Sequence, residues 1–192
     1  PARPFGADRS RAPALRLVGA DDPTAAVLLD QATAAEQGSR RDLARDLAER
    51  AIQRAREPNE VPVLAAALLA AARLASAAGE TGVALDILEA ALASATARGS
   101  HADCARAASL RSRVLWEAGD LGGAEGEAAR ARDWAHRAGD LREVAQCLRT
   151  LGALTVARGD LAGGIALYET ALADFRALGQ ASELSATLVS LG

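Results

Sequence analysis

The fold is decided by residues 151–179, which read LGALTVARGDLAGGIALYETALADFRALG. In this stretch two apolar segments of helical length flank Gly159-Asp160, and glycine is the residue that most often ends a helix. A glycine recurs every twenty residues, at Gly79, Gly99, Gly119, Gly139, Gly159 and Gly179. This internal repeat predicts helix pairs of about forty residues each, stacked as an α-solenoid.

Composition supports helices and narrows the range of partners. Alanine and leucine dominate, aromatic residues make up only 3 % of the chain, and β-branched residues are scarce, which favours helix over sheet. The formal net charge of −3 provides no field that would attract nucleic acid or an anionic membrane. No apolar run approaches the ~18 residues that a membrane helix needs. We therefore expect neither a nucleic-acid nor a membrane partner.

The numbers of cysteine and methionine residues bear on the cellular environment of the chain. Two cysteines are too few for a disulfide framework, so we expect a reduced, cytoplasmic protein. Cys104 and Cys147 stand where other units have small or aliphatic residues, which predicts that both side chains are buried. Methionine is absent, although natural gene products start with it, and we expect the chain to be a piece of a larger protein.

Caps and helix breakers divide the chain into segments. Residues 1–21 contain proline, glycine and arginine without a sustained period, which predicts a linker or disordered lead-in. The repeat domain is predicted at 22–192, with helix pairs at about 22–57, 62–98, 101–138 and 141–178 and the start of a fifth pair at 181–192.

Three polar residues are predicted to cap the helices that follow them. They are Ser39, Ser100 and Asp140, and each has an acidic residue three positions later, as in a capping box.

Small residues recur at fixed places within the pairs. In the last complete pair Gly152, Gly164 and Ala171 are separated by twelve and seven residues. The same spacing gives Ser112, Ala124 and Ala131, then Ala72, Ala84 and Ala91, then Ala32, Ala44 and Ala51. Helices cross closely only where side chains are short, so these sets predict the crossing points. An apolar stripe predicted to face the core consists of Leu161, Ile165, Tyr168, Leu172 and Phe175.

The last pair resembles the tetratricopeptide repeat family. The matching residues are Leu151-Gly152, Gly159-Asp160, Gly164, Tyr168 and Ala171. The units span about forty residues rather than the family's common ~34, and they lack its closing proline. In both respects they are similar to the long-helix variety found in bacterial regulators and kinesin light chain. The resemblance implies a right-handed superhelix of about four repeats plus a terminal helix, with first helices lining a concave groove. It also implies a protein- or peptide-binding scaffold, the repeat part of a larger bacterial regulatory or signalling protein.

By this resemblance, groove-facing residues come from the first helix of each pair. They are Thr33, Arg73, Arg106, Ser109, Arg113, Trp116, Gln146 and Arg149. Four arginines and a tryptophan suit an acidic or carboxylate-bearing partner, through forked hydrogen bonds and stacking. The alternative is that these arginines are ordinary solvated helix surface in an arginine-rich chain. The family's clamp for chaperone tails is not expected, because its places hold Leu69, Leu110 and Thr150.

The third pair departs from its neighbours in charge. Arg111, Glu125 and Arg132 occupy places that hold leucine or isoleucine in other pairs. If all three face inward they must pair, because an unpaired buried charge is costly, and we predict an Arg111–Glu125–Arg132 contact. The alternative is a rotated helix that leaves these charges in water.

Trp134 stands where other units have polar residues. An exposed tryptophan predicts a second interaction surface, whereas the alternative is a ring folded flat over its own helix. This surface and the open ends of the solenoid support a rival interpretation, in which the chain is a structural element that self-associates as a homodimer without a ligand.

The sequence offers no catalytic, cofactor or metal site. His101 and Cys104 are one helical turn apart, but two histidines and two cysteines are too few for a closed zinc site. Gly122-Gly123 lacks the Lys-Ser/Thr of a phosphate-binding loop. We expect no enzymatic activity and no cofactor.

Overall fold

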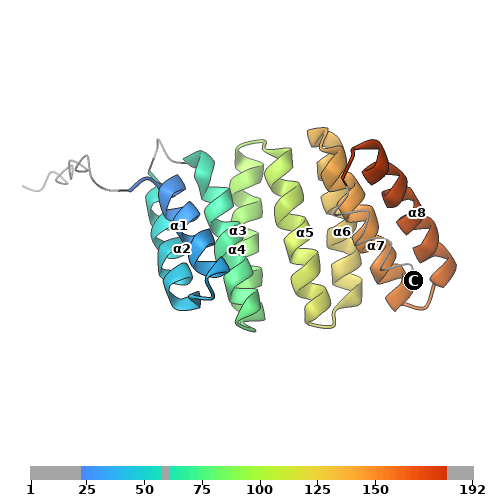
Figure 1. Cartoon of the computed structure of the whole chain (residues 1–192), viewed down its shortest axis with the longest axis horizontal. Helices are drawn as coiled ribbons and strands as arrows, with labels where there is room; N and C mark the ends of the chain where they lie inside the picture. Colours follow the sequence, from blue (N-terminus) through green and yellow to red (C-terminus); the bar gives the residue numbers. More distant parts are fainter. Residues whose placement is uncertain (1–22, 58–60, 181–192) are drawn as a thin grey trace, which may run out of the picture.

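The structure is a computed structural model that describes residues 23–57 and 61–180 (Figure 1). Within these residues the chain forms eight α-helices and no strand. The helices are α1 Ala25–Gln37, α2 Arg41–Ala55, α3 Val61–Ala77, α4 Thr81–Ala97, α5 His101–Glu117, α6 Leu121–Ala138, α7 Leu141–Ala157 and α8 Leu161–Ala177. The predicted lead-in at 1–21 and the predicted fifth unit at 181–192 lie outside the described residues.

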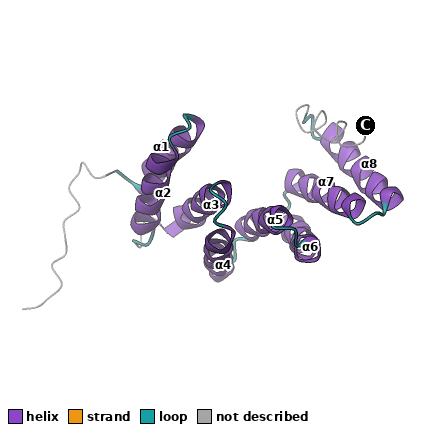
Figure 2. Ribbon diagram, turned by 90° about the horizontal axis from the view of Figure 1, so that it is seen from below, coloured by secondary structure: helices purple, strands orange, loops and turns teal. Residues whose placement is uncertain are grey.

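The helices stack in two rows. Each helix packs against the next in sequence, and the first helices of successive pairs also touch, α1 with α3, α3 with α5 and α5 with α7. In the described part of the chain the second helices, α2, α4, α6 and α8, make no comparable contacts with one another. Because the first helices contact one another and the second helices do so less, the stack bends into the arc seen in Figure 2, with the first helices on its concave side. The chain is an α-solenoid, as the sequence predicts.

The turns inside the pairs need a left-handed residue. Gly79, Gly119 and Gly159 follow first helices and have φ angles of 79°, 86° and 96°, a region that glycine enters without steric cost. The corresponding residue of the first pair is Ser39, with a φ of 58°. The prediction that Ser39 caps the second helix is therefore wrong, since Arg40 precedes α2 and no side chain caps its first turn.

The small residues predicted at the crossing points are all buried. Ser112 on α5 shows why a short side chain is needed, because its Oγ donates a 2.7 Å hydrogen bond to the carbonyl oxygen of Ala124 on α6. In the last pair a Cβ placed on Gly164 would lie 2.9 Å from the carbonyl oxygen of Gly152. The backbones of paired helices are thus in direct contact at the predicted places.

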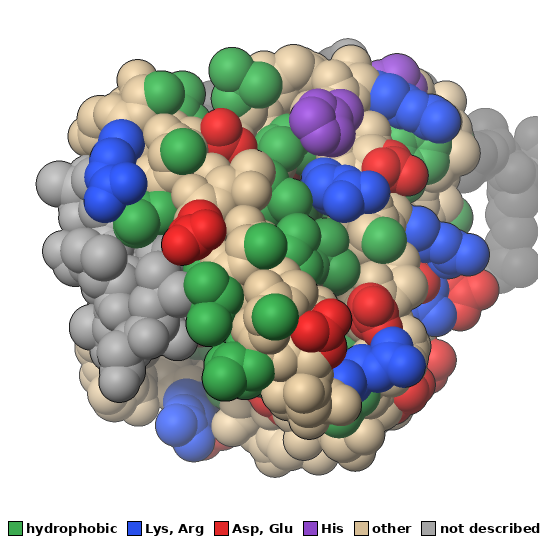
Figure 3. Space-filling view, turned by 90° about the vertical axis from the view of Figure 1, so that its right-hand side faces the viewer, with side chains coloured by type: hydrophobic (Ala, Val, Ile, Leu, Met, Phe, Trp, Pro, Cys, Tyr) green, Lys and Arg blue, Asp and Glu red, His purple; other side chains and the backbone are tan. Residues whose placement is uncertain are grey.

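The apolar stripe predicted on the last helix is only partly buried. Tyr168, Leu172 and Phe175 are buried, whereas Leu161 and Ile165 are 61 % and 37 % exposed. α8 is the last described helix, and hydrophobic side chains gather on the face seen from that end of the molecule (Figure 3). The first part of the stripe therefore belongs to the surface of the described stack.

The predicted Arg111–Glu125–Arg132 contact is wrong. Glu125 pairs instead with Arg158, which follows α7, and Arg132 Nη2 lies 3.6 Å from Asp133 Oδ1. The side chains of Glu125 and Arg132 are 38 % and 36 % exposed, so neither charge is buried within the pair. Among the described residues no ion pair joins Arg111 to either of them, and its Nε is buried without a hydrogen-bond partner.

Candidate functional site

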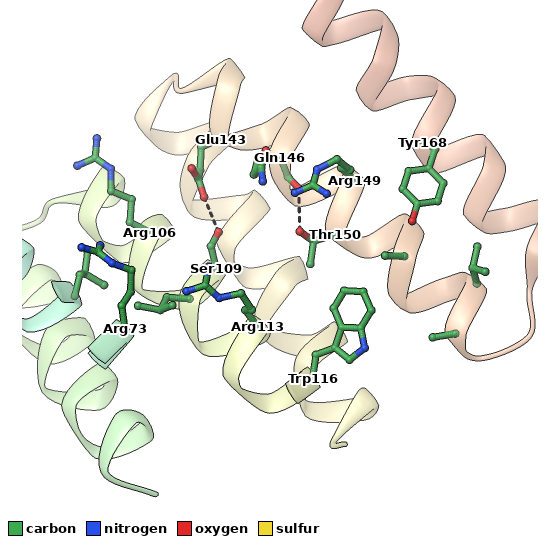
Figure 4. A pocket seen from close by; sticks show the side chains of 15 residues that line it. Arg73, Arg106, Ser109, Arg113, Trp116, Glu143, Gln146, Arg149, Thr150 and Tyr168 are labelled. Atoms are coloured by element: carbon green, nitrogen blue, oxygen red, sulfur yellow. Dashed lines mark hydrogen bonds between the residues drawn. The ribbon is translucent and has the colours of Figure 1, made fainter. Parts of the chain in front are cut away.

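The first helices α3, α5 and α7, together with Tyr168 of α8, line an open pocket of about 740 Å³ (Figure 4). Its lining residues are Leu69, Arg73, Arg106, Ser109, Leu110, Arg113, Trp116, Glu143, Gln146, Arg149, Thr150, Ala153, Val156, Ala157 and Tyr168. Every groove residue predicted from the sequence is among them except Thr33. The Oγ1 of Thr33 donates to the carbonyl oxygen of Leu29 at 3.0 Å on its own helix, α1. A pocket of this size is typical of ligand-binding sites.

Two helices supply most of the lining. Their contributions are Arg106, Ser109, Leu110, Arg113 and Trp116 from α5, and Glu143, Gln146, Arg149, Thr150, Ala153, Val156 and Ala157 from α7. Steps of three and four residues keep each set on one helix face. From Arg106 to Trp116 the helix rises by about 15 Å, so the pocket is an elongated groove rather than a round cavity.

The groove is polar at one end and apolar at the other. The N-terminal halves of α5 and α7 contribute Arg106, Ser109, Glu143 and Gln146, whereas their C-terminal ends contribute Trp116, Ala153, Val156 and Ala157. Figure 4 shows Tyr168 on the same side as Trp116, away from Arg106. An extended ligand lying along the helices would therefore place charged groups at one end and an apolar group at the other.

The four arginines of the groove differ in their partners. Arg73, Arg106 and Arg113 lie 3.9, 3.4 and 3.8 Å from carboxylates at the rim, which belong to Glu36, Asp103 and Glu117. These pairs are solvent-exposed and hold the guanidinium groups only weakly. Arg149 has no acidic partner among the described residues. All four therefore keep hydrogen-bond donors available to a ligand.

Sequence reasoning missed Glu143 as a groove residue and used it only as the partner of a helix cap. Asp140 and Ser100 do cap α7 and α5 as predicted, and Asp140 Oδ1 accepts the Glu143 N–H at 3.0 Å. The Glu143 carboxylate then reaches across to α5, where its Oε1 accepts a 2.6 Å hydrogen bond from Ser109 Oγ (Figure 4). Glu143 precedes Gln146 by three residues, so extending the α7 face by one turn would have found it.

The cysteine beside the groove, Cys147, is not an activated nucleophile. Cys147 lies behind Ser109, with Sγ 3.5 Å from Ser109 Oγ, and burial raises the pKa of its thiol to about 11. The thiol is therefore protonated at neutral pH and is a poor nucleophile. Cys104 and Cys147 are both buried, as predicted. Among the described residues no group of three or more His, Cys, Asp or Glu side chains is placed to hold a metal ion.

Trp134, the second predicted surface, is partly covered. Its ring centroid lies 5.3 Å from that of His101, and the Arg137 guanidinium lies 5.0 Å from its ring centroid. The ring also packs against a buried cluster that includes Val144 and Phe175. The ring of Trp134 is thus packed against neighbouring side chains. This favours the alternative interpretation, a covered ring, over an exposed interaction surface.

No helix in the described part of the chain combines the length and the apolar character that crossing a membrane requires.

No protein-family model and no curated protein matches the chain. Solved structures do resemble it. BtubC (BKLC) from P. vanneervenii superposes with a TM-score of 0.73 at 22 % identity, covering 87 % of this chain and 68 % of BtubC. A Rap protein in complex with competence and sporulation factor and the apo form of RapI each give a TM-score of 0.73, at 15 % and 12 % identity. These two matches cover 87 % of this chain, which spans 47 % and 46 % of theirs. The likenesses show a shared helical-repeat fold.

Proposed function

We propose that this chain is a protein- or peptide-binding module of the tetratricopeptide repeat type, and that its groove takes an acidic or carboxylate-bearing segment of the partner. The observation that carries the proposal is the convergence of Arg73, Arg106, Arg113 and Arg149 on one pocket. A guanidinium group matches a carboxylate with two parallel N–H···O bonds, which gives both energy and orientation. We propose binding rather than enzymatic catalysis as the function of this groove.

The electrostatics of the groove favour an anionic ligand. Four arginines and a single carboxylate, that of Glu143, line a pocket in a chain whose formal net charge is −3. Arg73, Arg106 and Arg113 each have a carboxylate within 4 Å, so the least compensated positive charge in the groove is that of Arg149.

The similar structures support this proposal by analogy. One of the Rap structures contains competence and sporulation factor, so an α-solenoid of this kind holds a partner in that case. From the sequence resemblance we further propose that this chain is the repeat part of a larger bacterial regulatory protein of the cytoplasm.

A pool of randomised pentapeptides tests the groove against many short sequences at once. The pool is passed over the immobilised chain, the bound peptides are sequenced by mass spectrometry, and the most enriched are titrated calorimetrically. We expect aspartate and glutamate to be enriched. Arg149→Ala should raise the dissociation constant by about tenfold or more, since a hydrogen bond to a charged group contributes about 1.5–3 kcal/mol.

Arg50→Ala is the matched control, because Arg50 is a 55 % exposed arginine on α2 outside the pocket. Its affinity for the enriched peptides should equal that of the parent chain. Enrichment that ignores acidic residues, or an equal loss in both variants, would refute a basic binding groove.

A second candidate function is self-association through the exposed residues of α8. The observation that favours it is the exposure of Leu161 and Ile165 on α8. Light scattering with and without an enriched peptide separates the two candidates. A monomer that binds peptide supports the groove, whereas a stable dimer that binds none supports self-association.

A further inference from the structure

We propose that the polar end of the groove binds a cationic group of the partner at Glu143, two or three residues away from the acidic group that Arg149 binds. The ligand class is thus a peptide with both charges, in which the cation is a free amino terminus or a lysine or arginine side chain. This inference rests on the proposed function and specifies which acidic peptides the groove accepts.

The negative charge of Glu143 is not neutralised by the arginines around it. Glu143 shares the pocket with four arginines, yet among the described residues no cation lies within ion-pair distance of its carboxylate. Arg106, at the same end of the groove, lies 3.4 Å from Asp103 instead. A carboxylate that only balanced the arginines would pair with one of them. The Glu143 charge is therefore available to a group from outside.

The second oxygen of Glu143 is free to receive that group. Oε1 is used by the hydroxyl of Ser109, at 2.6 Å, which fixes the direction of the carboxylate. Oε2 accepts no hydrogen bond from the described residues and is not buried. A carboxylate that is oriented by one hydrogen bond and open at its other oxygen is suited to accept from an ammonium or guanidinium group.

Arg149 supplies the complementary charge on the same helix. It lines the pocket from α7 and has no acidic partner among the described residues, unlike the other groove arginines. Glu143 and Arg149 are six residues apart in α7, which corresponds to a rise of about 9 Å. An extended peptide advances about 3.3–3.6 Å per residue, so two to three ligand residues separate the matching cation and anion.

The test uses two pools of randomised pentapeptides, one with free and one with acetylated amino termini, and the chain with and without Glu143→Gln. The glutamine oxygen still accepts from Ser109, so this variant removes the charge and keeps the contact that joins α5 to α7. We expect the parent chain to prefer peptides with a cation two or three residues from an acid by about tenfold or more. Glu143→Gln should lose this preference and keep the enrichment of acidic residues.

The acetylated pool identifies the source of the cation. If capture falls when the terminus is acetylated, the amino terminus is bound, whereas a shift toward lysine and arginine identifies a side chain, and either result supports the proposal. Glu169→Gln, which removes the charge of an exposed glutamate on α8 outside the pocket, should keep the preference and serves as the control. Acidic enrichment without a cation preference, or a preference that survives Glu143→Gln, would overturn the inference and leave the proposed function intact. Absence of acidic enrichment would reject the proposed function and this inference with it.

Discussion

Ser39 has a left-handed backbone conformation that the other pairs assign to glycine. Its φ is 58°, and its N–H donates to the Glu36 carbonyl oxygen at 3.0 Å, the same bond that Gly79 makes to Ser76 at 2.9 Å. This conformation costs an L-residue about 1–2 kcal/mol. We expect Ser39→Gly to stabilise the chain by about 1 kcal/mol, measured by urea unfolding followed by circular dichroism.

The reciprocal substitution is the matched control. A Cβ on Gly79 would have no atom within 4 Å, so Gly79→Ser tests backbone conformation without a steric clash. It should destabilise the chain by about 1 kcal/mol. If both substitutions shift the midpoint in the same direction, the conformation of this turn does not determine the difference.

Single residues show both the reach and the limit of the sequence pattern. The glycine period predicts where the left-handed turns lie, because few other residues adopt φ near 80° without strain. It failed at Ser39, whose residue type suits a cap and whose place in the forty-residue register identifies it as a turn residue. Register therefore predicts backbone conformation at this turn better than residue type does.

Helix α6 contains a buried acid where other second helices have aliphatic residues. Glu127 is 8 % exposed and corresponds in the repeat to Leu47, Ile87 and Leu167. Its Oε1 lies 3.1 Å from Nη1 of Arg130, a side chain that is 70 % exposed, and its Oε2 is buried without a partner. An unsatisfied buried group of this kind costs about 1–3 kcal/mol.

We therefore expect Glu127→Leu to raise the free energy of unfolding by about 1–2 kcal/mol in urea at pH 7. Glu169→Leu on α8 is the control, because Glu169 is exposed and its replacement should change stability by less than about 0.5 kcal/mol. A loss of stability in Glu127→Leu would instead show that the buried carboxylate stabilises the folded chain.

At the scale of elements, the sequence predicts contacts within a pair better than contacts between pairs. The crossing points follow from side-chain size alone, and the groove face follows from helical periodicity. The pairing of Glu125 with Arg158, 33 residues away, depends on how each pair is rotated against the next. No local pattern encodes that rotation, and for this reason the predicted Arg111–Glu125–Arg132 contact was wrong.

The whole molecule is held together by contacts between neighbours. Within the described residues, α1 and α2 reach the rest of the stack through α3, and Arg45 on α2 adds a 3.1 Å ion pair to Glu80 before α4. Leu88 on α4 is fully buried in a cluster formed with residues of α3 and α5. Leu154 on α7 is equally buried, in a cluster with residues of α6. Stability in such a stack is close to a sum of local terms.

Two matched truncations should therefore open different ends of the solenoid. Leu88→Ala and Leu154→Ala each remove about 2–5 kcal/mol of packing. In native-state hydrogen exchange we expect Leu88→Ala to lower amide protection in α1 to α4 while α7 and α8 stay protected, because opening spreads only across adjacent interfaces. Leu154→Ala should give the reverse, with α7 and α8 opening first. Equal loss of protection in all helices for both variants would show that the described residues unfold as one cooperative unit, in contradiction to a stack whose pairs are coupled only through their neighbours.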